Sequence, residues 1–334
     1  MKKFLFILIW FFSLIIVSLY TYDHPETIER IIHYYTLNKE PEVKLEKTNA
    51  QKVLANSFSV EFSKIISLSE KTAFIVYDDK ILKFNENFLK IYTQNGYLIK
   101  NLKSKKLNLP NVFTTQRNGG IKTIFIYNNN EFALISSSKK NCFYASIVYL
   151  NNGRELFKTK CLTDTKKNTD FNGLGSSNIH HKNKIILSIG APEQGSFKIR
   201  ALAQDNNSMF GKIIEINKTD IDRVITNEES NLSLKIFSTG HRNPQGLTKI
   251  NDSFFSVEHG PKGGDELNKI LKDKNYGWPK VSYGTQYVHD EVGKAYEINH
   301  ENNQFEEPLF ALVPSIGISA LNTCPTKLKE YYKK

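Results

Sequence analysis

The sequence predicts an all-β fold of the propeller type, and three observations lead to this prediction. From about residue 59 onward, short runs rich in Ile, Val, Phe, Tyr and Thr alternate with clusters of Asn, Asp, Gly and Lys, the compositions of strands and turns. No long amphipathic helix alternates with these runs, which disfavours a parallel α/β sheet. A unit of strand, short turn, strand and longer loop recurs weakly about every 40 to 50 residues. At 334 residues, the chain also exceeds most single-domain sandwiches and barrels.

The individual strands are expected to be antiparallel and half-buried. Leu232, Leu234 and Ile236 alternate with polar residues, which places one face of the strand in a core and the other toward solvent. After Pro314 the sequence reads SIGISALNTCPTKLKEYYKK and lacks the strands of a further blade. We therefore expect the last blade to be incomplete.

The amino terminus is predicted to direct export. Residues 1–20 place Lys2 and Lys3 before an apolar run, as in a signal peptide or an amino-terminal membrane anchor. The run is slightly short for a full span and no small-x-small cleavage site follows, so both readings stay open. Residues 21–54 are polar and read as a linker, and residues 55–334 as the propeller domain. The body of the protein is expected to be periplasmic or otherwise extracytoplasmic, either secreted or tethered.

The net charge of +11, from 45 Lys and Arg against 34 Asp and Glu, raises the question of an anionic partner. The basic residues are mostly lysines scattered between strands, with no basic helix and no nucleic-acid-binding motif. We therefore expect a solvated lysine-rich surface, no nucleic-acid partner, and membrane contact only through residues 1–20.

Three cysteines are too few for a disulfide scaffold. Cys142 and Cys161 flank two strand-like runs around Asn151-Asn152-Gly153, which is a hairpin signal. A two-residue Asn151-Asn152 loop would place the two cysteines opposite each other, whereas an Asn152-Gly153 loop would make them diagonal neighbours. A cross-strand disulfide is a hypothesis in either register.

Most histidines offer no metal or catalytic pattern. His180 and His181 are adjacent, so on a strand they would point to opposite faces and would not share one zinc ion; we expect them in a turn before the strand KIILSIG. No nucleophile elbow, dinucleotide fingerprint or phosphate loop is present. Hydrolase and nucleotide-binding functions therefore find no local support.

Residues 239–283 carry the polar groups with the clearest chemistry. Arg242 and Asn243 lie between Gly240 and Pro244, where glycine allows close backbone approach and proline fixes the turn. A guanidinium and a side-chain amide held in this way could bind an anionic, carbonyl-rich ligand. The alternative is a structural arginine that bonds loop carbonyls.

The next loop, residues 260–266, combines Gly260-Pro261 with Gly-Gly-Asp-Glu. Its backbone carbonyls and carboxylates are oxygen ligands suited to a hard cation such as calcium, although the pattern is not an EF-hand. The alternative is an ordinary acidic turn.

Three linked segments resemble the glucose/sorbosone dehydrogenase family: GHRNPQGL at 240–247, SVEHGPKGGDELNKI at 256–270 and KNYGWPKVSYG at 274–284. Weaker similarity extends to residues 201–217 and 306–319. Members are quinoprotein aldose sugar dehydrogenases that use pyrroloquinoline quinone (PQQ) and calcium on a six-bladed β-propeller. The resemblance implies an exported oxidoreductase with a sugar substrate and an external electron acceptor.

The resemblance also implies roles for single residues. Arg242 and Asn243 correspond to the pair that contacts the quinone. Gly260 and Pro261 correspond to positions whose backbone carbonyls bind the calcium on the cofactor, and Glu266 and Tyr276 to ligands of a further, structural calcium. In the family mechanism a histidine base removes the sugar hydroxyl proton while hydride passes to the quinone.

Two positions depart from the family pattern. The family's catalytic histidine corresponds to Asn172 in DFNGLGSS, and an asparagine amide cannot act as a general base. The family's cofactor-contacting glutamine corresponds to Asn118, one methylene shorter. The cationic residues that the family contributes from its last blade would lie beyond Lys334. We therefore expect weak or no activity from this chain, and a propeller that binds sugar or a protein partner without redox turnover is the alternative function.

Overall fold

The computed structural model describes residues 40–45, 51–54, 59–62, 66–69, 71–77, 89–115, 118–140, 142–162, 174–192, 197–285 and 296–323. The predicted signal or anchor at residues 1–20, and Asn172, lie outside the described residues. The chain divides into two compact units, residues 1–69 with 115–117, and residues 70–114 with 118–334. No helix among the described residues is long and apolar enough to cross a membrane.

The first unit contains two short antiparallel ladders. Strand β1 (Val43–Leu45) pairs with β4 (Ile66–Leu68), and β2 (Gln51–Leu54) pairs with β3 (Ser59–Phe62). The predicted boundary between linker and propeller at residue 55 stays a prediction, with β1 and β2 on its amino-terminal side.

The second unit contains four antiparallel sheets of four strands each among its described residues, in the orders β5-β6-β7-β8, β12-β11-β10-β9, β13-β14-β15-β16 and β17-β18-β19-β20. Their strands are β5 (Thr72–Tyr77), β6 (Leu89–Thr93), β7 (Tyr97–Lys100), β8 (Lys103–Lys106), β9 (Ile121–Tyr127), β10 (Asn130–Lys139), β11 (Cys142–Tyr149), β12 (Arg154–Lys158), β13 (Asn178–His181), β14 (Lys184–Ile189), β15 (Lys212–Asn217), β16 (Lys235–Thr239), β17 (Pro244–Ile250), β18 (Ser253–Glu258), β19 (Asp265–Ile270) and β20 (Phe310–Leu312).

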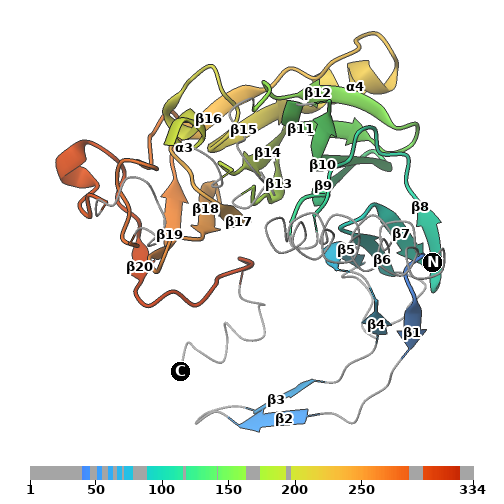
Figure 1. The fold of residues 1–334 in the computed structure, drawn as a ribbon, viewed down its shortest axis with the longest axis horizontal. Helices are drawn as coiled ribbons and strands as arrows, with labels where there is room; N and C mark the ends of the chain where they lie inside the picture. The colour runs from blue at the N-terminus through green and yellow to red at the C-terminus, as the bar shows by residue number, and fades with distance from the viewer. Residues whose placement is uncertain are drawn as a thin grey trace, which may run out of the picture. The chain divides into compact units, whose positions relative to one another are not determined.

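These sheets are arranged like the blades of a propeller (Figure 1). Within each of these sheets, every strand pairs with the next one along the chain, so each sheet is a simple meander. The first strand of each sheet contacts the first strand of the following one, since β5 meets β9, β9 meets β13 and β13 meets β17. Such first-strand contacts are what blades around a shared axis require. The prediction of a mostly-β fold built from antiparallel strands is confirmed.

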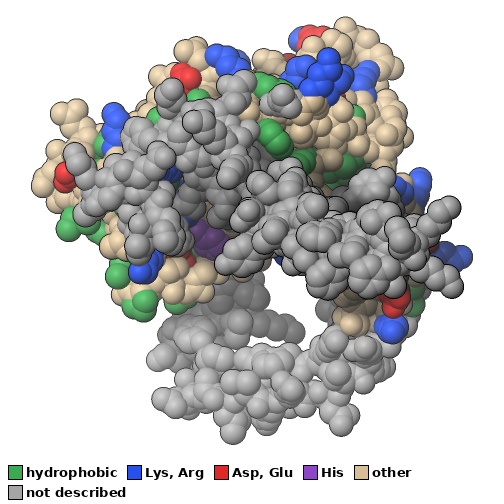
Figure 2. Space-filling model, in the orientation of Figure 1, with side chains coloured by type: hydrophobic (Ala, Val, Ile, Leu, Met, Phe, Trp, Pro, Cys, Tyr) green, Lys and Arg blue, Asp and Glu red, His purple; other side chains and the backbone are tan. Residues whose placement is uncertain are grey.

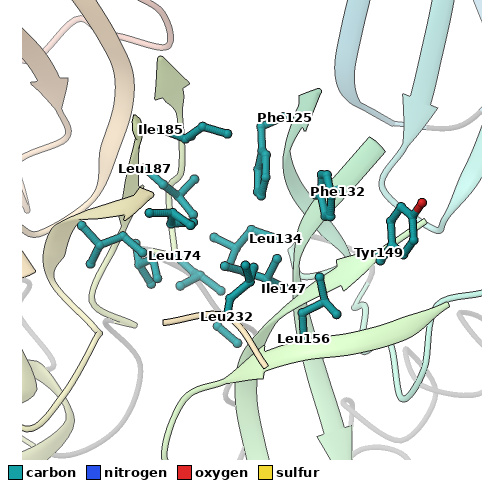
Figure 3. Close-up of a cluster of buried hydrophobic side chains, with 14 of the residues drawn as sticks. Phe125, Phe132, Leu134, Ile147, Tyr149, Leu156, Leu174, Ile185, Leu187 and Leu232 are labelled. Carbon is teal, nitrogen blue, oxygen red and sulfur yellow. The ribbon is translucent and has the colours of Figure 1, made fainter. Parts of the chain in front are cut away.

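The hydrophobic core lies between neighbouring sheets. In the largest cluster, side chains from β9–β12 meet side chains from β13–β16, as Leu134 and Ile147 do with Ile185 and Leu187 (Figure 3). A second cluster joins β6 to β9–β11, and a third joins β13–β16 to β17–β19. Successive residues of one strand enter opposite layers, since Leu134 belongs to the first cluster and Ala133 and Ile135 to the second. Central strands such as β10 are therefore buried on both faces, and the expectation of half-buried strands was wrong for them.

Among the described residues, short helices lie in the connections between strands. Helix α3 (Phe197–Ala201) continues into the 3-10 turn η2 (Leu202–Gln204), α4 (Lys218–Ile225) follows β15, and η3 (Glu301–Asn303) precedes β20. The fully buried Lys212 donates from Nζ to the carbonyls of Leu202, Ala203 and Phe210 at 2.7–3.0 Å. This contact fixes η2 against β15.

The β11–β12 hairpin contains a disulfide between Cys142 and Cys161, whose Cα atoms are 5.2 Å apart. Tyr149 pairs with Arg154, so the turn has the register in which Asn151 and Asn152 form the loop. A bulge after Val148 then shifts the register. The hypothesis of a cross-strand disulfide is confirmed.

The expected turn at His180-His181 was wrong. Both residues belong to β13, and the turn lies one step later, at Lys182-Asn183, where Lys182 adopts a φ of 52°. As expected for neighbours on a strand, their side chains diverge: His180 is exposed, while His181 packs edge-on against Phe254.

Lysine and arginine side chains occur at several separate places on the face shown in Figure 2, some of them close to acidic side chains. Among the described residues, Lys184 pairs with Glu215 at 2.7 Å.

Candidate functional site

The link between β16 and β17 positions the predicted Arg–Asn pair. Gly240 has a φ of +76°, and its amide donates to the carbonyl of Ala203 at 3.1 Å. A Cβ at this position would lie 2.2 Å from Asn275 Oδ1, so only glycine fits. Arg242 and Asn243 follow as buried residues, 5% and 7% exposed, directly before β17.

The side chain of Glu258, at the end of β18, fixes the backbone of this link. Its Oε2 accepts from the amide of Arg242 at 2.8 Å, and its Oε1 accepts from Asn268 Nδ2 at 3.0 Å. The same Oε1 lies 2.9 Å from His241 Nδ1, and His241 Nε2 lies 2.8 Å from Ser238 Oγ. Burial raises the pKa of Glu258, but His241 and the three donated hydrogen bonds outweigh it and hold the pKa below its usual value.

Ser238, His241 and Glu258 have the hydrogen-bond order of a serine hydrolase triad. Ser238 and His241 are completely buried, and neither lines the pocket described below. A nucleophile must reach its substrate, so these residues hold the Arg242 link in place and do not form a hydrolase site.

Arg242 contacts two neighbouring loops. Its NH1 donates to the carbonyl of His259 at 2.7 Å, and its guanidinium lies 5.2 Å from the centre of the Trp278 ring. Gln204 in turn donates to the carbonyl of Trp278 at 2.6 Å and so anchors the aromatic partner. The planar cation is therefore held over an aromatic face, a geometry that a lysine would not reproduce.

Asn243 contacts His259 through one backbone hydrogen bond and one side-chain hydrogen bond. The amide of His259 donates to the carbonyl of Asn243 at 3.1 Å, and Asn243 Nδ2 lies 3.2 Å from His259 Nδ1. The loop after His259 is held by Asp265, which is 1% exposed and accepts from the amide of Gly260 at 3.1 Å. Asp265 also accepts from the amides of Gly317 and Ile318.

Glu266 is a second buried carboxyl beside Glu258. Burial, and next the negative charge of Glu258, raise its pKa to about 8. Asn268 Nδ2 bridges the two, and His300 Nε2 lies 3.7 Å from Glu266 Oε1. Two buried carboxyls with one shared donor form an electronegative site. Among the described residues, however, no three His, Cys, Asp or Glu side chains are close enough together to hold a metal.

One pocket collects most of these groups, and its empty space of about 240 Å³ includes space open to solvent. It is lined by Gly240, Arg242, Glu258, His259, Gly260, Glu266, Tyr276, Trp278, Val281 and Ser282. The structure therefore brings together four residues predicted from the sequence: Arg242, Gly260, Glu266 and Tyr276. Asn243 and Pro261 are their direct neighbours in the chain.

Two predicted positions are placed differently. Asn118 precedes β9 in another sheet and is not among the residues that line this pocket. The hydroxyl of Tyr276 is committed to the backbone, since it donates to the carbonyl of Lys269 and accepts from the amide of Leu271 at 2.9 Å. Sequence reasoning missed His259 and Trp278 as pocket residues. Both stand inside the segments that carried the family resemblance, in EHGP and YGWP, which was the available signal.

The fold and the pocket together define a protein of meandering four-stranded sheets with an arginine and two carboxyls at the ends of β17–β19. A family model described as Glucose / Sorbosone dehydrogenase matches residues 89–333. The chain belongs to the Glucose / Sorbosone dehydrogenase family.

Individual relatives agree with this assignment. A segment of 112 residues is 35% identical to the aldose sugar dehydrogenase YliI of Escherichia coli and covers 32% of this chain and 28% of that protein. A segment of 97 residues is 35% identical to the quinoprotein glucose dehydrogenase B of Acinetobacter calcoaceticus and covers 28% of this chain and 19% of that one. The matched part is thus less than a third of either relative. The crystal structure of the soluble aldose sugar dehydrogenase from Escherichia coli shares the fold, with a TM-score of 0.55 at 22% identity over 75% of this chain and 74% of that chain.

Proposed function

We propose that this chain is an exported quinoprotein oxidoreductase that oxidises an aldose sugar, with pyrroloquinoline quinone and calcium as cofactors, on a propeller of six blades. The observation that carries the proposal is the pocket around Arg242, which joins the three sequence segments typical of the family. The names of the two relatives, an aldose sugar dehydrogenase and a quinoprotein glucose dehydrogenase, support the same substrate class and cofactor.

The described residues fit one edge of a planar, polyanionic quinone. Arg242 offers a permanent cation and Trp278 a flat face, while Asn243 adds an amide at the same strand end. Because the space around these residues is partly open to solvent, they would contact part of the cofactor and not enclose it. When bound, the quinone would accept the hydride that the sugar loses.

The donor set also suits calcium. Oxygen ligands are what this cation prefers, and Glu266 is a buried carboxyl whose pKa is raised by burial and next by the charge of Glu258. Gly260 and Pro261 would contribute backbone carbonyls near the cofactor. Because the hydroxyl of Tyr276 is committed, any metal contact of this residue would come from its carbonyl.

A second candidate is a propeller that binds sugar or a protein partner without redox turnover. It is favoured by Asn172, which stands where the family has its histidine base and cannot take up the hydroxyl proton. Asn118, which stands in the place of the family's cofactor-contacting glutamine and is one methylene shorter, also favours this candidate. The two candidates share the pocket and differ in whether a proton acceptor faces the sugar.

Export is part of the proposal. Residues 1–20 support it, because an apolar run follows Lys2 and Lys3 there. The disulfide between Cys142 and Cys161 supports it as well, because disulfides persist in oxidising compartments. In the periplasm or outside the cell, the enzyme would pass electrons to an external acceptor. Its contact with a membrane would be limited to residues 1–20.

The test is reconstitution with pyrroloquinoline quinone and calcium, followed by dye reduction with a panel of aldoses. We expect bound cofactor with slow turnover, and a gain of about a hundredfold in Asn172→His, since a general base contributes factors of this size. Bound cofactor without turnover in either protein would favour the second candidate. Absence of both binding and turnover would contradict the proposed function.

A further inference from the structure

His259 carries an uncommitted hydrogen-bond donor at the pocket, in a residue to which the family resemblance assigned no role. His259 is among the residues that line the pocket, next to Glu258 and Gly260 in the chain. Its Nε2 is buried from solvent and has no hydrogen-bond partner among the described residues. Buried polar atoms are nearly always paired, so an unpaired one at a pocket wall requires an explanation.

The tautomer of His259 follows from its neighbours. Asn243 Oδ1 accepts from Gln245 Nε2 at 2.9 Å, which turns the amide nitrogen of Asn243 toward the imidazole. That nitrogen lies 3.2 Å from His259 Nδ1 and can only donate, so Nδ1 accepts. In the neutral ring the proton is therefore on Nε2.

Asn243 contacts the ring of His259 at Nδ1, and the residues predicted to contact the cofactor also hold its backbone. The backbone amide of His259 donates to the carbonyl of Asn243, and its backbone carbonyl accepts from Arg242 NH1. The carboxylate of Asp265, which holds the loop after His259, already accepts from the amides of Gly260, Gly317 and Ile318. A fixed ring with one committed nitrogen and one free N–H is pre-organised for an acceptor brought by a ligand.

We propose that His259 Nε2–H is a cofactor-binding donor, which hydrogen-bonds a carboxylate or carbonyl oxygen of the quinone beside Arg242. This inference rests on the proposed function, because the acceptor belongs to the proposed cofactor. The N–H of His259 would be a third contact beside those of Arg242 and Asn243. It would select for an acceptor oxygen at one position on the edge of the ligand.

Two substitutions separate the two ring nitrogens. His259→Asn keeps an acceptor for Asn243 near the position of Nδ1 and removes the donor at the position of Nε2. His259→Gln extends an amide nitrogen toward the position of Nε2 and so keeps a donor. Equilibrium titration of each full-length protein with pyrroloquinoline quinone, in the presence of calcium, measures affinity without any need for turnover.

We expect His259→Asn to weaken cofactor binding by about ten- to a hundredfold, the range for a hydrogen bond to a charged group, and His259→Gln to recover part of this loss. Both variants should unfold at a temperature close to that of the wild type. Equal affinity in the wild type and His259→Asn would overturn the inference and leave the proposed function intact. If the wild type itself fails to bind the quinone, both the inference and the proposed function are contradicted.

A measurement on the unsubstituted protein covers the case in which a variant does not fold. With ¹⁵N-labelled histidine, the neutral form of the His259 ring should carry its proton on Nε2, and its Nε2 resonance should shift on addition of the quinone. An unchanged His259 resonance in a protein that binds the cofactor would overturn the inference.

Discussion

Gly240 determines where the side chain of Arg242 is placed. Its positive φ reverses the chain after β16, and the absence of a side chain lets Asn275 and Gly277 approach. We predict that Gly240→Ala lowers the free energy of unfolding by several kcal/mol, because backbone strain of about 1 kcal/mol adds to a steric clash.

Gly263 provides the matched control for that change. It has a similar φ of +86°, but a Cβ there would meet no atom within 4 Å. Gly263→Ala should therefore cost only the strain of about 1 kcal/mol. Urea unfolding of both variants measures the difference, and equal losses would show that close packing at Gly240 is unimportant.

Lys212 is a buried ammonium whose stability contribution depends on pH. Burial lowers its pKa from 10.5 to about 8. Between these two values the unfolded chain holds the proton and the folded protein does not, so stability rises with pH. Relative to Lys212→Met, the free energy of unfolding of the wild type should rise by about 1.4 kcal/mol per pH unit from pH 8 to 10. Parallel stability curves for the two proteins would refute this.

Among the elements, the β11–β12 hairpin is closed by the disulfide between Cys142 and Cys161, which are 19 residues apart. A cross-link around a loop of this length is expected to contribute about 3 kcal/mol through the unfolded state. The double substitution Cys142→Ser with Cys161→Ser should lower the free energy of unfolding by that amount, measured by denaturant titration. A reducing agent should reproduce the effect in the wild type and leave the variant unchanged.

The layer between β9–β12 and β13–β16 should be the most sensitive to loss of volume. Leu187 is fully buried there, so Leu187→Ala should cost about 3 kcal/mol through lost burial and an unfilled cavity. Leu309 is 56% exposed, and Leu309→Ala should cost less than about 1 kcal/mol. Thermal and urea unfolding compare the two, and similar losses would argue against a core between these sheets.

Strands were more predictable from the sequence than helices and turns. Strands β14, β15 and β18 come from short runs rich in Ile, Phe and Val between clusters of turn residues, so composition identifies them. Helix α4 has only two buried residues, Ile221 and Val224, and this periodicity is too short to stand out. The histidines of β13 were assigned to a turn because nothing local marks where a two-residue turn begins.

At the scale of the whole molecule, the pocket could be predicted only in part. Residues 239–283 span the end of β16 to the loop after β19, so the motif pattern already places Arg242, Gly260 and Glu266 near one another. The contact of Arg242 with Trp278 depends on Gln204, which comes from η2 and lies 74 residues from the tryptophan. Such a long-range contact leaves no periodic or local signal in the sequence.

The central claim is that this pocket binds a quinone through the fork of Arg242, and direct titration with pyrroloquinoline quinone in the presence of calcium tests it. The wild type should bind, and Arg242→Lys should bind at least about tenfold more weakly, because lysine keeps the charge but loses the planar fork and the contact with Trp278. Arg223→Lys, on the exposed surface of α4, is the matched control and should bind like the wild type. Absence of binding in the wild type, or equal affinity in Arg242→Lys, would contradict the claim.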